Sequence, residues 1–166
     1  MVTCQFYRTW KDMIERCYSE KLQARKLMYK GCSVCGEWLI FSNFKAWMQQ
    51  QDWQGKELDK DILVKGNKVY SPSTCAFVNT LTNTFVTDSR SKKSSLPSGA
   101  FWHKNRNNYG SACKNPFSKR LEYLGSYDNP LDAHLAWKKR KHEFACQLAE
   151  LQSNPCVAEA LRNRYV

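Results

Sequence analysis

The sequence predicts an α+β protein built from two small units. Apolar residues recur at three- and four-residue spacing near the start of the chain and again near its end, which indicates helices. Between these segments lie short apolar stretches bounded by Gly, Asn and Pro, which indicate strands. A Ser- and Lys-rich stretch near residues 87–98 separates the two patterns and predicts a linker.

The chain length sets the expected domain organisation. With 166 residues, of which 42% are hydrophobic, the chain has room for one or two small domains. We expect a first domain at residues 1–88, a basic linker at 89–98, a second domain at 99–152 and a C-terminal tail at 153–166.

Membrane and zinc chemistry are not expected from the sequence. No stretch approaches the roughly 18–20 apolar residues of a membrane span, so no membrane partner is predicted. The N-terminus lacks the apolar core of a signal peptide, which favours an intracellular location with reduced thiols. Cys32 and Cys35 form one Cys-x-x-Cys pair, whereas a structural zinc ion needs four ligands. Buried thiols are therefore the favoured interpretation, and a zinc site at this pair is the alternative.

The first part is expected to contain helices on both sides of two short strands. The apolar spacing predicts a helix over about residues 6–22, and Ser42 is expected to cap a second one. Strands are predicted at Leu58–Val64 and Lys68–Tyr70, joined by a turn at residues 65–67. A short helix at Asn79–Val86 is expected to follow.

The second part is expected to form a sheet backed by one helix. Three strands are predicted, at Gly99–Lys104, Tyr109–Lys114 and Arg120–Ser126, with Asn-rich turns between them. Pro130 suits the first turn of a long helix. The expected buried face of that helix carries Ala133, Trp137, Phe144, Leu148 and Leu151.

The positive charge is concentrated in one segment. The chain has a formal net charge of +11, and residues 89–142 alone hold 12 basic and 3 acidic side chains. A surplus of cations in one segment is typical of a surface that binds a polyanion, because phosphate contacts release condensed counterions. A solvated charged face is the alternative interpretation, and nucleic acid is the favoured one.

Residues 6–86 contain a set of residues that together form a recognisable pattern: Tyr7, Trp10, Met13, Arg16, Cys17, Tyr18, Val34, Glu37, Trp38, Phe41, Asn43, Phe44, Trp47, Leu58–Leu63, Tyr70–Pro72, Cys75, Phe77, Val78 and Asn83. In this pattern, residues 6–86 resemble a family of phage HNH endonuclease-like proteins, often described as homing endonucleases. The resemblance implies a small ββα-metal part with flanking helices. It also implies a phage- or prophage-encoded protein of the host cytoplasm that cuts or nicks double-stranded DNA with a divalent metal.

The same resemblance assigns candidate catalytic residues. Asp59, Asp61 and Asn83 are the implied ligands of Mg²⁺ or another divalent cation, which prefers carboxylate and amide oxygens. Lys60 stands where the family usually has its histidine general base. A lysine with its ordinary pKa is protonated at neutral pH and is no efficient base. Structural roles for these side chains, as caps and pairs at a hairpin, are the open alternative.

Residues 98–150 contain a second recognisable pattern, which consists of Gly99–Lys104, Tyr109, Leu124–Asp128, Ala133, Ala136 and Trp137. In this pattern, residues 98–150 resemble the DNA-binding domain first described in plant ethylene-response factors, the apetala-two type. The resemblance implies a three-stranded antiparallel sheet that enters the major groove of double-stranded DNA while one helix packs behind it.

Aromatic and basic residues alternate along the predicted sheet. Strand alternation places Trp102 and Lys104 on one face and Phe101 and His103 on the other. The predicted DNA-binding residues are Trp102, Lys104, Arg106, Tyr109, Lys114, Lys119 and Arg120, with Lys92 and Lys93 in the linker. In the alternative interpretation Trp102 packs on the helix and the cations are only solvated.

Two functions follow from these expectations. The first is a sequence-recognising, metal-dependent DNA endonuclease or nickase of the HNH type. The second is a catalytically inactive DNA-binding protein on the same scaffold, acting as a regulator or an anti-host factor. The histidine missing near Asp59 favours the second function, and the surrounding motif favours the first.

Overall fold

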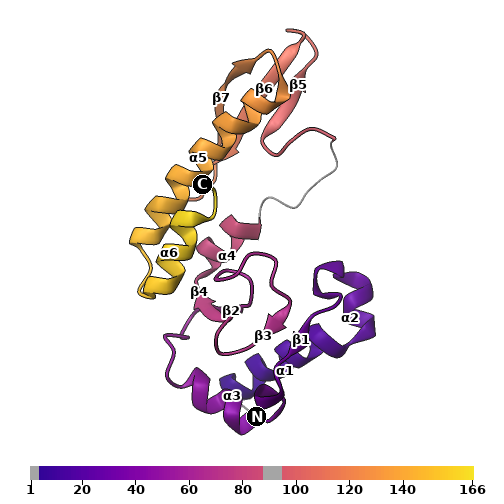
Figure 1. Cartoon of the computed structure of the whole chain (residues 1–166), viewed down its shortest axis with the longest axis vertical. Helices are drawn as coiled ribbons and strands as arrows, with labels where there is room; N and C mark the ends of the chain where they lie inside the picture. Colours follow the sequence, from indigo (N-terminus) through magenta and orange to yellow (C-terminus); the bar gives the residue numbers. More distant parts are fainter. Residues whose placement is uncertain (1–3, 88–94) are drawn as a thin grey trace. The chain divides into compact units, whose positions relative to one another are not determined.

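A computed structural model of the chain describes residues 4–87 and 95–166, and all structural statements below refer to these residues (Figure 1). The chain forms two compact units, residues 1–83 and 84–166. The division falls within α4 (Thr80–Thr87), earlier than the boundary after residue 88 that the sequence predicts. Helices and a three-stranded antiparallel sheet together confirm the α+β class.

The first unit begins with two helices where the sequence predicts one. Helix α1 (Gln5–Tyr18) ends because Ser19 adopts an extended backbone, and the Ser19 side chain then caps α2 (Glu20–Arg25). The prediction of a single helix over residues 6–22 is therefore wrong. After the short 3-10 helices η1 (Leu27–Tyr29) and η2 (Gly36–Leu39), helix α3 (Phe41–Met48) starts with Ile40 at the cap position. Ser42 lies in the first turn of α3 and is not the predicted cap.

The core of the first unit is aromatic. Trp38 and Phe44 are fully buried and their ring centroids lie 5.1 Å apart, while Trp47 packs 4.5 Å from Trp38. The indole of Trp10 on α1 donates a hydrogen bond to the Trp38 carbonyl at 2.7 Å. This core fixes α1 and α3 against each other and supports the strands of the unit.

The strand pairing of the first unit differs from the predicted hairpin. Strand β1 (Ser33–Val34) pairs in parallel with β3 (Val69–Tyr70). Strand β2 (Glu57–Asp59) pairs in antiparallel with β4 (Ala76–Val78), which leads into α4. The predicted strand Leu58–Val64 stops at Asp59, because its carboxylate accepts hydrogen bonds from the amides of Asp61 and Ile62 and turns the chain. The order β2, β4, α4 is a ββα arrangement.

The second unit contains the predicted sheet. Strands β5 (Ala100–His103), β6 (Asn108–Lys114) and β7 (Leu121–Tyr127) form an antiparallel sheet in the order β5-β6-β7, which confirms the prediction to within a residue at most ends. Helix α5 (Pro130–Glu150) runs along one side of the sheet (Figure 1). The hydroxyl of Ser111 on β6 donates to the Ala133 carbonyl of α5 at 2.6 Å. This bond identifies the helix side of the sheet.

The expected C-terminal tail is a helix. Helix α6 (Pro155–Asn163) lies beside α5, with Val157 and Leu161 fully buried. Asn154 caps α6 by accepting from the amides of Cys156 and Val157. An Asn cap followed by Pro and apolar residues four apart is a helix signal that the interpretation of residues 153–166 as a tail missed. None of the helices in residues 4–87 and 95–166 is long and apolar enough to cross a membrane.

Candidate functional site

Side-chain alternation on β2 places Glu57 and Asp59 on the same face of the strand. Leu58 and Lys60 are buried, whereas Glu57 is exposed and Asp59 is partly buried. Because successive side chains of a strand point to opposite faces, Leu58 lies on the face opposite to Glu57 and Asp59. Lys60 follows the last residue of β2, so strand alternation does not determine its direction, and its charge acts on the Asp59 carboxyl.

Asn83 on α4 contacts a residue that the sequence analysis did not single out. Its amide donates a hydrogen bond to Glu57 Oε2, and the Thr80 hydroxyl donates to Glu57 Oε1 at 3.1 Å. The antiparallel register pairs Glu57 with Val78, so the start of α4 lies at the Glu57 end of β2. Glu57 immediately precedes the predicted strand Leu58–Val64, and its position two residues before Asp59, on the same face of an extended chain, is the signal that could have identified it.

Asp59 is held by backbone amides. Its Oδ1 atom accepts from Asp61 N and Ile62 N, both at 2.7 Å. Burial raises the pKa of this carboxyl above its usual range, and the neighbouring Asp61 carboxylate raises it further. Asp59 therefore acts first as the turn residue that ends β2, the structural role that the sequence left open.

Lys60 is enclosed by the loop that follows β2. Its ammonium donates to the Asn67 carbonyl at 2.9 Å and to Asp61 Oδ2 at 3.3 Å. Asn67 in turn donates to the Lys60 carbonyl at 2.6 Å and to the Val69 carbonyl at 2.7 Å. These bonds hold the loop between β2 and β3 closed around the buried lysine.

The predicted metal ligands all have protein partners. Asn83 is bonded to Glu57, Asp61 to Lys60, and one oxygen of Asp59 to backbone amides. Carboxylate and amide oxygens are the donors that Mg²⁺ prefers, but binding at this set requires some of these bonds to be exchanged for bonds to the metal. In the described ranges, no group of three or more His, Cys, Asp or Glu side chains is arranged to hold a metal ion. Magnesium coordination here stays a prediction.

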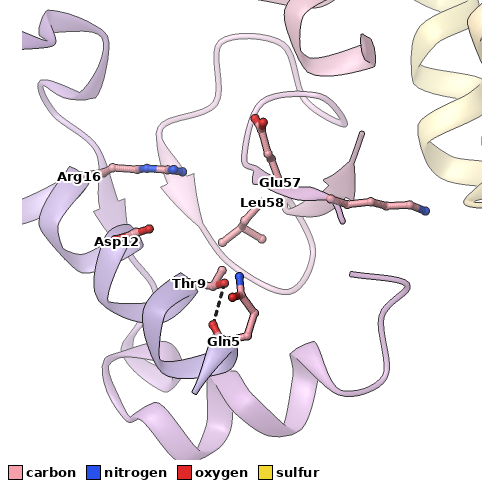
Figure 2. A pocket seen from close by; sticks show the side chains of 7 residues that line it. Gln5, Thr9, Asp12, Arg16, Glu57 and Leu58 are labelled. Carbon is pink, nitrogen blue, oxygen red and sulfur yellow. Dashed lines mark hydrogen bonds between the residues drawn. The ribbon is translucent and has the colours of Figure 1, made fainter. Parts of the chain in front are cut away.

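A polar pocket of about 140 Å³ lies between α1 and β2 (Figure 2). Asp12 and Arg16 reach it from α1, and Glu57 and Leu58 reach it from β2. The remaining lining residues are Gln5, Thr9 and Lys56. Charges of both signs line this pocket, so it presents no single field to an ionic ligand.

Four of the cysteines of the first unit are free thiols in or beside its core, whereas Cys4 is exposed. Cys32 is buried, Cys35 is partly buried, and the sulfur of Cys32 points to the Met28 carbonyl at 3.8 Å. Burial raises the pKa of both Cys17 and Cys75 to about 12. Thiols with such pKa values stay protonated and unreactive at neutral pH.

The two faces of the C-terminal sheet follow from the strand register. Ala100 pairs with Ser111 and Trp102 with Tyr109, so these four side chains lie on the helix side. The Trp102 and Tyr109 rings pack 4.9 Å apart. The predicted separation of Trp102 from Phe101 and His103 is correct, but Trp102 does not lie on the face away from the helix. The Trp102 side chain is nevertheless 43% exposed, and its ring contact is with Tyr109 of the neighbouring strand.

The open face of the sheet, opposite α5, carries three aromatic rings. Phe101 and His103 come from β5 and Tyr123 from β7, with Phe101 4.9 Å and Tyr123 5.9 Å from the His103 ring. Between them lies Gly110, where an added Cβ would stand 2.5 Å from the Phe101 ring and 2.8 Å from His103 Nε2. The side chains of β5 therefore lean over the central strand. We call Phe101, His103 and Tyr123 the aromatic platform.

The predicted cations lie at the two ends of the sheet. Lys104 and Arg106 occupy the β5–β6 turn, Lys114 ends β6, and Lys119 and Arg120 precede β7. All five are exposed, and none forms an ion pair within the part of the chain that the structure describes. Lys92 and Lys93 lie outside the described residues.

Two of the cations of α5 have partners within the second unit. Arg140 is bonded to Glu122 of β7 at 2.8 Å and to Glu143 at 2.6 Å, with its guanidinium 4.2 Å from the Phe144 ring centroid. Lys141 is buried, and its ammonium donates to the Phe85 carbonyl at 3.1 Å. These two charges stabilise the second unit, whereas Lys139 of the same helix is exposed.

Comparison of the chain with protein-family models, with curated protein sequences and with solved structures finds no match.

Proposed function

We propose that this chain is a DNA-binding protein in which the sheet of the second unit contacts DNA. The observation that carries the proposal is the set of five exposed cations at the ends of the sheet, none of which has an ion-pair partner in the described residues. Phosphates attract such side chains, and the released counterions supply much of the affinity. The net charge of +11 supports the same partner.

We further propose that the first unit is a catalytically inactive HNH-like scaffold. This proposal is supported by the hydrogen bonds of Lys60, whose buried ammonium already donates to Asn67 and Asp61. A general base must reach the water that it deprotonates, whereas the Lys60 side chain is buried and its ammonium is already bonded within the loop. The protein then acts by occupying DNA, as a phage- or prophage-encoded regulator or anti-host factor in the host cytoplasm.

A second candidate function is metal-dependent nicking of double-stranded DNA. The observation that favours it is the order β2, β4, α4, which brings Asn83 of the helix to the side of β2 from which Glu57 and Asp59 leave. Bound Mg²⁺ would supply Lewis-acid activation of a phosphate and its attacking water. Asp59, Asp61 and Asn83 would hold it.

DNA binding is tested by salt titration with the full chain. We expect a fluorescently labelled duplex to bind with an affinity that falls steeply with salt. Arg106→Gln and Lys114→Gln should each lower the slope of log affinity against log salt by about one. Lys26→Gln is the matched control, because Lys26 is an exposed cation of the first unit. A slope that responds equally to all three variants would contradict the proposed surface.

Nicking is tested on supercoiled plasmid with Mg²⁺ or Mn²⁺, with and without chelator. The proposal of an inactive scaffold expects the plasmid to stay supercoiled under all conditions. Chelator-sensitive nicking that disappears in Asp59→Asn, with duplex affinity unchanged, would replace it by the second candidate function.

A further inference from the structure

The aromatic platform is an exposed surface at the centre of the open face. The Phe101 side chain is 37% exposed and Tyr123 52% exposed, although both lie in the middle of their strands. Between Phe101 and Tyr123 the central strand contributes only the small residues Gly110 and Ala112. The rings of the outer strands therefore project beyond the side chains of the central strand. Large exposed rings gathered on one sheet face indicate a site that receives a partner.

The hydrogen-bonding groups of the platform are few. The Tyr123 hydroxyl is already bonded to Ser126 Oγ at 2.7 Å. His103 Nε2 and Asn108 Oδ1, on paired residues at one end of the platform, are buried without a hydrogen-bond partner among the described residues. The centre of the face therefore offers ring surface, and its unmet polar groups lie at one end.

Positive charge borders the platform at both ends. Residues 108–114 of β6 run the length of the face, about 20 Å at 3.3 Å per residue. Arg106 lies beyond one end of this strand and Lys114 stands at the other. The nearby carboxylate of Glu122 is turned to the helix side, where Arg140 binds it, so it places no negative charge on the platform. Rings between two cationic ends match a chain of bases joined by phosphates.

We propose that the aromatic platform binds unpaired bases of a DNA strand by stacking, with the cations at either end binding the flanking phosphates. The proposal rests on the DNA-binding function proposed above and specifies the form of DNA that is bound. In a duplex the bases stack on one another and expose only their edges, which are recognised by hydrogen bonds. The platform offers exposed aromatic rings, and stacking on aromatic rings suits bases that have left the duplex stack.

The experiment uses the full chain and three labelled probes of about 16 nucleotides, the upper range of site sizes for single-strand binders. One probe is a single strand of mixed sequence, the second is the same sequence as a duplex, and the third is a strand of abasic sugar-phosphate units. The third probe keeps the phosphates and removes the bases. Binding is followed by fluorescence anisotropy at matched salt.

The variants separate stacking from folding. Phe101→Leu and Tyr123→Leu should each weaken binding of the single strand about tenfold and leave the abasic probe unchanged. Tyr123→Phe keeps the ring and should bind like the parent. Phe117→Leu is the matched control, because Phe117 is an aromatic residue of the same unit, 43% exposed, whose ring packs against Phe144 of α5. Thermal unfolding of each variant confirms that the fold is kept.

Each outcome has a defined meaning. We expect the single strand to bind at least about tenfold more tightly than the abasic strand, and more tightly than the duplex. Equal binding of the single and abasic strands, or single-strand binding that Phe101→Leu and Tyr123→Leu leave unchanged, would overturn the stacking proposal and leave DNA binding intact. If no probe binds even at low salt, the proposed DNA-binding function fails as well.

Discussion

Lys60 and Asn67 hold each other by reciprocal hydrogen bonds between side chain and backbone. The Lys60 ammonium donates to the Asn67 carbonyl at 2.9 Å, and the Asn67 amide donates to the Lys60 carbonyl at 2.6 Å. The two bonds close the loop after β2 and keep a charged side chain buried with an acceptor in place. Such an arrangement is typical of a structural lysine.

Removing the charge of Lys60 should lower the free energy of unfolding of the first unit. Lys60→Met keeps much of the volume but removes the ammonium that lies 3.3 Å from the buried Asp61 carboxylate. We expect the free energy of unfolding to fall by about 3 kcal/mol, measured by urea denaturation. Duplex affinity at temperatures where the fold is intact should not change. A variant of unchanged stability that has lost a nicking activity would instead identify Lys60 as catalytic.

Asp59 should make the protein less stable as the pH rises. Its pKa is raised in the folded state by burial and by Asp61, so folding favours the protonated form. The associated stability is present below the unfolded-state pKa of about 3.9 and is lost as the pH rises through the folded-state value. Asp59→Asn keeps the acceptor for Asp61 N and Ile62 N and removes the charge. We expect higher stability at neutral pH and a weaker pH dependence in the acidic range, both measured by thermal unfolding. A loss of stability at neutral pH would mean that the carboxylate charge is needed.

Gly99 should not tolerate a side chain. Its φ is +81°, and an added Cβ would lie 2.0 Å from Cγ of Trp137 on α5. Gly99→Ala should lower the free energy of unfolding by about 3 kcal/mol, from the left-handed backbone and the steric conflict together. Gly66→Ala is the matched control, because Gly66 has a φ of +80° with no atom within 4 Å. This control should lose only about 1 kcal/mol. Equal losses at the two positions would show that Trp137 moves aside.

Replacing Lys119 with glycine should stabilise the fold and weaken DNA binding. It is one of two non-glycine residues with positive φ in the described chain, at +59°. Lys119→Gly should relieve about 1 kcal/mol of backbone strain and raise the melting temperature. The same change removes one cation of the proposed surface, so the salt slope of DNA binding should fall by about one. A more stable variant with an unchanged slope would show that Lys119 does not contact phosphate.

Local patterns predicted the second unit better than the first. The three strands of the sheet were found because alternation and turn residues act between neighbours in sequence. The parallel pairing of β1 with β3 joins residues 36 positions apart, Ser33 with Val69, and no local signal specifies it. The same holds for the bond from Asn83 to Glu57 across 26 positions. Alternation separated Trp102 from Phe101, but only the packing of α5 decides which face is open.

The Gly110 position constrains how this protein and its descendants vary. The Phe101 ring occupies the space that a β-carbon at position 110 would need, and His103 Nε2 also lies within 2.8 Å of that position. A mutation of Gly110 to a larger residue therefore requires the side chains at positions 101 and 103 to move or to be replaced by smaller ones. In a set of homologous sequences these positions should covary, and lineages that keep glycine at 110 should be those that keep aromatic residues on the neighbouring strand.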